Sequence, residues 1–292
     1  MPSTYAHYRF GEKVLEKLPE EIRATVEKNR ELYDIGQHGP DFFFFYKPFG
    51  KNSIQANGSR MHRTIFKSFL IPAAEKIRAD NIKVEKDKDL AYILGFICHY
   101  ALDNACHGYI EKKIHVSGIR HNVIEGDFER YLLVKDGKDP VKEKIIDGIL
   151  TPSPENAAVI SSFFPGIPAK EIESALKQMV RFHHILYAPN AIKRNLLLAG
   201  LRITGLYGGV QGHVMRPKAN PACADSSLRL YRLMELAEDR AVELILAFFE
   251  FLDGKTTLDD RFAGTFGPGH DWKSIPVLSP EEEAGYTPVL PD

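Results

Sequence analysis

Five residues near the middle of the chain have the types and the spacing of a metal site. His99, Asp103 and His107 follow one another at intervals of four residues, and His121 and Glu125 repeat that interval. In an α-helix, residues four positions apart lie on the same face, about one turn from each other. Imidazoles and carboxylates that converge from two helices are ligands that a divalent ion such as zinc prefers. The spacing therefore predicts two helices that meet at a metal site.

The same residues also allow a second interpretation, a buried hydrogen-bond network without metal. They lie in an otherwise apolar segment, where unpaired polar groups are costly. Two imidazoles, an aspartate and a neighbouring histidine–glutamate pair would need many mutual partners to satisfy one another. We therefore favour a metal site over the network.

The elements that must position these residues are helices. Residues 87–113 form a long, mostly apolar segment that we expect at the centre of the core, and 119–135 resume as helix after Gly118. Further helices are expected at 11–30 with a break at Pro19, and at 60–79, 139–150, 154–163, 169–187, 189–206 and 224–253. Loops are expected at 34–58 and 207–222, and an irregular tail at 260–292. These patterns, with no β-alternation, predict an all-α fold, a single domain over 1–292 with a metal cluster in a cleft.

Composition narrows the class of protein. The chain has 292 residues, 44% of them hydrophobic, and a formal net charge of −1. It can bury a sizeable core, and it carries no broad basic field to attract nucleic acid or anionic lipid. No apolar run approaches membrane-spanning length, and the first residues lack the pattern of a signal peptide. The three cysteines, Cys98, Cys106 and Cys223, fit a reducing compartment, so we expect a soluble cytoplasmic protein.

Several catalytic motifs do not occur in the sequence. It contains no H-E-x-x-H, no pair of E-x-x-H motifs, no C-x-x-C, no G-x-x-x-x-G-K-[ST] and no G-x-S-x-G. These absences exclude the zincin proteases and the ferritin-like di-iron proteins. The five histidine and acidic residues of the predicted metal site, between 99 and 125, are therefore the feature that any function must explain.

Five segments together resemble the zinc-dependent phospholipase C family, whose relatives include single-strand nucleases of the P1/S1 type. They are TYAHYRFG with His7, GPDFFFFY with Asp41, SRMHRT with His62, GFICHYALDNACHGY with His99, Asp103 and His107, and HNVIEGDF with His121 and Glu125. They occur in the family's order within residues 1–130, whereas 140–292 carry no motif that we can assign. The resemblance implies an all-α fold with a cluster of up to three zinc ions in a cleft.

The resemblance also implies which residues hold each zinc ion. The ligands of the first would be Asp41, His62, His99 and Asp103. The ligands of the second would be His107, His121 and Glu125. The third would be held by His7 and the far oxygen of Asp103, with Asp41 as a further bridging candidate.

Two features depart from the pattern of the secreted phospholipases and the nucleases. Their segment after the shared aspartate is longer, H-x3-D-x5-H, whereas His99, Asp103 and His107 follow H-x3-D-x3-H. Those enzymes also use the α-amino group of an N-terminal Trp as a zinc ligand, but the single Trp here is Trp272. Removal of Met1 would expose only the secondary amine of Pro2. We therefore expect two zinc ions, while a third depends on a ligand that the sequence does not supply.

The resemblance implies a zinc-dependent phosphodiester hydrolase, nominally a phospholipase C, with a phosphoester such as a phospholipid as substrate. A metal-activated water would attack phosphorus, and Asp41 is the candidate for orienting or deprotonating it. One alternative is a P1/S1-like nuclease, in which aromatic residues at 42–46 could stack bases, or another phosphoesterase with a soluble substrate. Another is a non-catalytic helical protein stabilised by metal. The second zinc site has only three protein ligands, which favours catalysis because structural zinc sites normally have four.

Overall fold

The computed structural model describes residues 4–48, 50 and 52–291. These residues form thirteen α-helices and five short 3-10 helices, with no β-strand among them, so the all-α prediction is confirmed. The α-helices are α1 (Thr4–Lys17), α2 (Glu20–Lys28), α3 (Arg30–Gly36), α4 (Ser53–Met61), α5 (Lys67–Ala79), α6 (Lys83–Ser117), α7 (His121–Lys135), α8 (Pro154–Ser161), α9 (Ala169–Leu186), α10 (Ala191–Ile203), α11 (Tyr207–Val210), α12 (Ala224–Leu252) and α13 (Pro280–Gly285). The 3-10 helices are η1 (Asp41–Phe45), η2 (Gln211–His213), η3 (Pro221–Cys223), η4 (Asp260–Ala263) and η5 (Trp272–Ser274).

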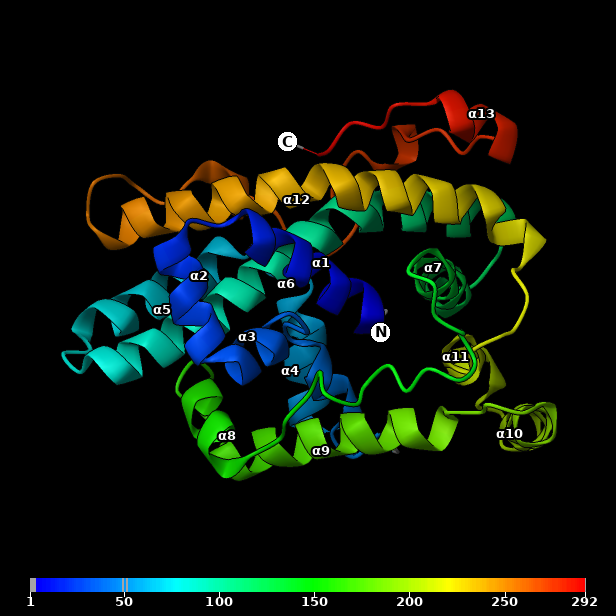
Figure 1. Cartoon of the computed structure of the whole chain (residues 1–292), viewed down its shortest axis with the longest axis horizontal. Helices are drawn as coiled ribbons and strands as arrows, with labels where there is room; N and C mark the ends of the chain where they lie inside the picture. The colour runs from blue at the N-terminus through cyan, green and yellow to red at the C-terminus, as the bar shows by residue number, and fades with distance from the viewer. Residues whose placement is uncertain (1–3, 49, 51, 292) are drawn as a thin grey trace.

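The helices pack as a single domain around α6. In Figure 1, α12 runs along one side of the molecule beneath the C-terminal tail and α9 along the opposite side, with α1 to α6 between them. Helix α6 packs against α1, α3 and α12, and residues 91–100 are all buried. A helix enclosed on all sides has apolar residues around its whole circumference, as residues 90–98 of α6 do. Neither α6 nor any other described helix is long and apolar enough to cross a membrane.

Two glycines allow the backbones of α3 and α6 to come into direct contact where the helices cross. A Cβ atom added to Gly36 would lie 2.3 Å from the carbonyl oxygen of Tyr92, and one added to Gly95 would lie 2.1 Å from that of Tyr33. Any larger residue would therefore separate the two helices. This close crossing brings the turn that follows α3 against the middle of α6.

The sequence predicts helices correctly where the apolar pattern is long. The predicted break at Pro19 is confirmed, because α1 ends at Lys17 and α2 begins at Glu20. The predicted loop at 34–58 is wrong in part, because it contains η1 and most of α4, whose N-terminus is capped by the Asn52 side chain. The predicted helix at 139–150 is also wrong: these residues form turns, with Gly148 at a φ of +80°.

The described part of the tail, 260–291, is irregular outside η4, η5 and the short α13, much as predicted, but it is firmly packed. It lies along the outer side of α12 in Figure 1, and the buried Arg229 of that helix donates two hydrogen bonds, of 2.8 and 2.7 Å, to Glu283. Phe262 and Phe266 of the tail are buried in the main core. The tail therefore brings Phe266 to the predicted metal site.

Candidate metal centre

The eight predicted ligand residues gather along α6 from five elements. They are His7 on α1, Asp41 at the start of η1, His62 at the C-terminus of α4, His99, Asp103 and His107 on α6, and His121 and Glu125 on α7. Seven of them form two groups in which one possible ligand atom per residue lies within 4.8 Å of the others. We call His7, Asp41, His99 and Asp103 the inner group, and His107, His121 and Glu125 the outer group.

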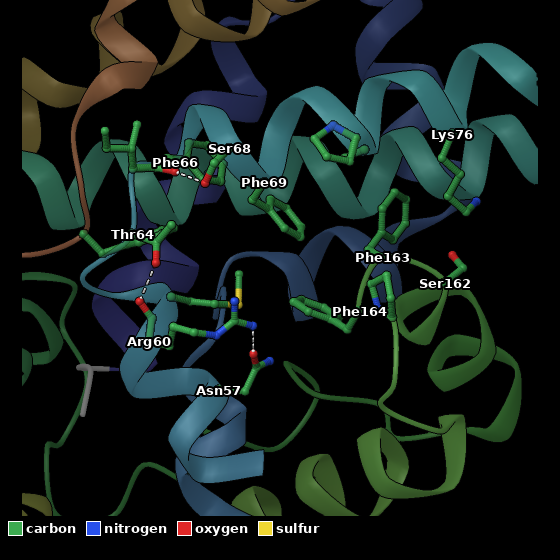
Figure 2. A pocket seen from close by; sticks show the side chains of 16 residues that line it. Asn57, Arg60, Thr64, Phe66, Ser68, Phe69, Lys76, Ser162, Phe163 and Phe164 are labelled. Carbon is green, nitrogen blue, oxygen red and sulfur yellow. Dashed lines mark hydrogen bonds between the residues drawn. The ribbon is translucent and has the colours of Figure 1, made fainter. Parts of the chain in front are cut away.

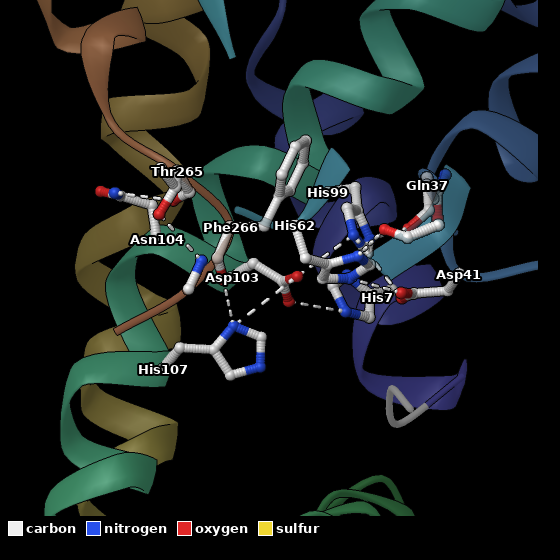
Figure 3. Close-up of polar contacts among 12 residues, drawn as sticks. His7, Gln37, Asp41, His62, His99, Asp103, Asn104, His107, Thr265 and Phe266 are labelled. Carbon is white, nitrogen blue, oxygen red and sulfur yellow. Dashed lines mark hydrogen bonds and ion pairs between the residues drawn. The ribbon is translucent and has the colours of Figure 1, made fainter. Parts of the chain in front are cut away.

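Asp103 lies at the centre of the inner group (Figure 3). Its Oδ1 is 3.3 Å from Nε2 of His7, and its Oδ2 is 3.1 Å from Nε2 of His99. Asp41 Oδ2 is 3.6 Å from the same His99 nitrogen. Its Oδ1 is 2.8 Å from Nε2 of His62, so His62 reaches the inner group through Asp41.

The two oxygens of Asp103 face different histidines, His7 and His99. This arrangement is compatible with the expected division of His99 and His7 between two zinc sites. Pro2, the candidate for an additional N-terminal ligand, lies outside the described residues. The number of ions therefore stays a prediction.

The outer group continues from the inner group toward the surface. Glu125 Oε1 is 2.8 Å from Nε2 of His121 and 3.6 Å from Nε2 of His107. Nδ1 of His107 is 3.7 Å from Oδ2 of Asp103, which links the two groups. The His121 side chain is 38% exposed, whereas that of His99 is 0% exposed. The inner group is thus more deeply buried than the outer group, and a small cavity of about 30 Å³, with His7, Asp103, His107 and Glu125 in its lining, reaches both groups.

Backbone carbonyls set the orientation of three imidazoles. The Nδ1 atoms of His99, His62 and His107 bond to the carbonyl oxygens of Gln37, Gly58 and Phe266, respectively. A carbonyl oxygen only accepts, so each Nδ1 must donate its proton. In the neutral ring Nε2 then carries the lone pair, and in all three residues Nε2 faces a carboxylate. Metal-bound histidines are commonly held in this way.

The ring of His99 is also held by its neighbours. Gly39 lies in the turn after α3 with a φ of +46°, and a Cβ atom there would be 2.2 Å from the His99 ring. On another side, the His7 ring stacks on it with ring centroids 4.4 Å apart. The close approach that Gly39 permits leaves His99 little freedom to rotate.

Several buried atoms of the two groups have no hydrogen-bond partner in the described part of the chain. They include Nε2 of His99, Nδ1 of His7, Oδ2 of Asp41 and Oε2 of Glu125. His99 Nε2 has carboxylate oxygens 3.1 and 3.6 Å away but forms no hydrogen bond of good geometry with either. Each unpaired buried polar atom costs about 1–3 kcal/mol, which a shared cation would relieve. This donor set of imidazoles and carboxylates fits zinc.

Charged neighbours within the site shift the pKa values of its residues in the direction opposite to the effect of burial. Burial alone raises the pKa of the Asp103 carboxyl, but the His107 and His99 imidazoles outweigh it and hold that pKa well below its usual range. Burial alone lowers the pKa of His107, but Asp103 and Glu125 raise it to about 9. Without metal, protonated imidazoles therefore neutralise the carboxylates, and a divalent ion would displace those protons.

Phe266 is part of the site, and our sequence reasoning missed it. Its carbonyl oxygen accepts a hydrogen bond from His107. Its ring centroid lies 5.4 Å from that of His99 and 5.6 Å from that of His62. A backbone carbonyl has no sequence signature, and the residue belongs to a tail without a motif. No sequence signal would have identified it.

Two further histidines lie beside the predicted ligands. His38 is fully buried, and neither ring nitrogen has a hydrogen-bond partner in the described residues. Burial, together with nearby His7 and His99, holds its pKa well below the usual value, so the ring is neutral. His213 lies in the segment predicted as a loop, but it is partly buried, and burial lowers its pKa to about 4.

Comparison with known proteins agrees with this geometry. The model of a family described as zinc-dependent phospholipase C matches residues 6–167. This range contains all eight predicted ligands but not Phe266. No curated protein and no solved structure matches the chain.

Proposed function

Since the chain belongs to the zinc-dependent phospholipase C family, we propose that it is a zinc-dependent hydrolase of phosphoric esters. The observation that carries this proposal is the convergence of unpartnered imidazole and carboxylate atoms in two adjoining groups. We assign the inner group together with His62, and the outer group, as the zinc ligands.

The two groups would have different tasks. The inner group is more deeply buried, so it would hold zinc closer to the core, and the small cavity that it shares with the outer group has room for water. The outer group offers three protein ligands at a partly exposed position, which leaves room for water or substrate. When bound, zinc would supply positive charge for the phosphate oxygens and lower the pKa of a coordinated water.

We propose that Asp41 orients the attacking water. Burial alone raises its pKa, but His99 and His62 outweigh it and lower the pKa, so the carboxylate is ionised. Its Oδ2 is buried and has no hydrogen-bond partner within the described residues. An ionised oxygen in that position can accept a hydrogen bond from water. Because a lowered pKa makes a weak base, orientation of the water suits Asp41 better than removal of its proton.

We propose a phospholipid as the substrate, cleaved on the diacylglycerol side of the phosphate. The family membership supports this choice. Cys98, Cys106 and Cys223 are free and buried, which supports a reducing compartment such as the cytoplasm as the proposed location. A cytoplasmic enzyme would encounter soluble phosphoesters as well, so the assay must compare substrate classes.

The first test measures zinc content and catalysis together. We expect the purified protein to contain zinc by elemental analysis and to hydrolyse a chromogenic phosphodiester. The His99→Ala variant should lose both properties. The matched control is His115→Ala, which removes an exposed histidine from the same helix. A metal-free wild-type protein with no turnover would refute the proposal.

The second test separates the candidate functions. Phosphatidylcholine vesicles and single-stranded DNA are supplied to the zinc-loaded protein in parallel. Release of phosphocholine supports the phospholipase, and release of nucleotides supports a nuclease. Bound zinc with no turnover of either substrate or of the chromogenic diester would favour a non-catalytic, metal-stabilised protein.

A further inference from the structure

A cavity of about 370 Å³ lies between α4, α5 and the turn that follows α8 (Figure 2). Most of its lining is apolar, with Met61, Phe66, Phe69, Phe163, Phe164 and Phe266 among the lining residues. Figure 2 shows the rings of Phe69, Phe163 and Phe164 around it. A volume in this range and an aromatic lining are typical of sites for small molecules.

This cavity is separate from the metal centre. None of the eight predicted ligands lines it. Phe266 forms the shared wall, because its ring lines the cavity and also lies 5.6 Å from that of His62 and 5.4 Å from that of His99. No residue to which the proposed hydrolysis assigns a metal ion or the attacking water lines the cavity.

Two cations belong to the cavity lining, and they differ in their partners. Lys76 is neutralised by an ion pair with Asp89. Arg60 has no carboxylate partner among the described residues, and its side chain donates a hydrogen bond to the amide oxygen of Asn57. Figure 2 shows its guanidinium group beside Asn57. The cavity thus combines an apolar interior with one positive charge that is not neutralised.

We propose that this cavity binds a fatty acid, with the hydrocarbon chain among the aromatic rings and the carboxylate on Arg60. Ten of the sixteen lining residues are apolar, which favours a hydrocarbon chain. The free guanidinium favours an anionic head, because it can form charge-assisted hydrogen bonds with a carboxylate. A cationic head would be repelled by Arg60.

The test is isothermal titration calorimetry of the zinc-loaded full chain with hexanoate, octanoate, decanoate and dodecanoate below their micelle concentrations. We expect the affinity to rise by about fourfold for each added methylene until the cavity is full. Dodecyltrimethylammonium, with the same chain length and a cationic head, should bind more weakly than dodecanoate. Equal affinity for the two dodecyl ligands, or no dependence on chain length, would overturn the proposal.

Two variants locate the bound molecule. Arg60→Ala should weaken dodecanoate binding by up to about fivefold, because the side chain is exposed and its charge is screened. The matched control, Arg63→Ala, removes an exposed arginine three residues away that does not line the cavity, and it should leave the affinity unchanged.

Ala73→Leu should fill part of the cavity and weaken binding by about tenfold or more, because Ala73 is a buried residue of its lining. If circular dichroism shows that this variant does not fold, Ser68→Trp, at an exposed lining position, replaces it. Undiminished binding by Arg60→Ala and by the folded filling variant would place the fatty acid elsewhere and overturn the proposal.

Discussion

The inner and outer groups are built from the same two kinds of side chain but lie in different surroundings. The inner group joins α1, η1 and α6, and its carboxylates and imidazoles are buried. The outer group joins only α6 and α7, and His121 at its edge is 38% exposed. Asp103 connects the two groups through His107.

This difference suggests a division between stability and reactivity. Carboxylates in the core require a compensating cation, so loss of metal or of one ligand leaves an unpaired charge in a dry environment. At the outer group, water can replace a lost partner, so the cost in folding free energy is small. Four predictions test this division.

Asp103→Ala should have the largest effect, because it removes the carboxylate shared by both groups. We expect the free energy of unfolding to fall by about 3–5 kcal/mol, the usual cost of removing one partner from a buried charge pair. Zinc content and phosphodiesterase activity should be lost together. Urea unfolding and elemental analysis measure these effects.

The control for this variant is Asp260→Ala, since the Asp260 side chain is 99% exposed on the surface. Its unfolding free energy should stay within about 0.5 kcal/mol of the wild-type value. An Asp103→Ala protein that keeps its full zinc content would show that this residue does not join the two groups.

A paired comparison of His99→Ala and His121→Ala addresses the division directly. The first should lower the free energy of unfolding by about 3 kcal/mol, because it removes the fully buried imidazole that faces both Asp41 and Asp103. The second should lower it by about 0.5 kcal/mol, because its ion pair with Glu125 is partly solvated. Both should abolish most of the activity. Similar losses of stability in the two variants would contradict the division.

Removal of zinc by a chelator should destabilise the protein by an intermediate amount. At free zinc a hundredfold above the dissociation constant, bound metal contributes about 2.7 kcal/mol per site, and chelation removes this contribution. Differential scanning calorimetry with and without chelator measures the shift. In His99→Ala the chelator should shift the midpoint less than in the wild type, because only the outer group keeps all its ligands, and an undiminished shift there would place the stabilising ion elsewhere.

The smallest effect is a pH dependence at the outer group. In the metal-free protein, burial lowers the pKa of His107 but Asp103 and Glu125 raise it to about 9, above its ordinary value of 6.5. The charged form therefore adds stability that is fully present below pH 6.5 and is lost as the pH rises through 9. The same proton must leave before zinc binds, so zinc affinity should rise about tenfold per pH unit between pH 7 and 8.

Competition with a fluorescent zinc chelator across this pH range measures that slope. His107→Gln removes the titrating group and should flatten the dependence. A slope that is the same in the variant and the wild type would assign the released proton to another residue.

Much of the fold could be predicted from the pattern of apolar residues. Helices α6 and α12 are long, so many turns contribute to the same periodic signal, and both were predicted within a few residues. The segment at 139–150 is short and contains Pro140 and Gly148, and it forms turns instead of a helix. The helix propensity of such a segment is too weak to outweigh the influence of the residues that pack around it.

The sequence by itself determined which side chains on α6 and α7 can bind a metal ion. The interval of four residues places His99, Asp103 and His107 on one helix face, because the geometry of the α-helix is fixed by local hydrogen bonds. The likeness to a known family added His7, Asp41 and His62, although they lie on separate elements.

Only the tertiary structure decided how these residues meet and how deeply each of them is buried. The crossing of α3 and α6 at Gly36 and Gly95 brings Gln37 and Asp41 to His99, and the packed tail brings the carbonyl of Phe266 to His107. These contacts join segments far apart in the chain, and two of them use backbone carbonyls, which every residue possesses. A pattern of residue types cannot encode such contacts, because they depend on how whole helices pack.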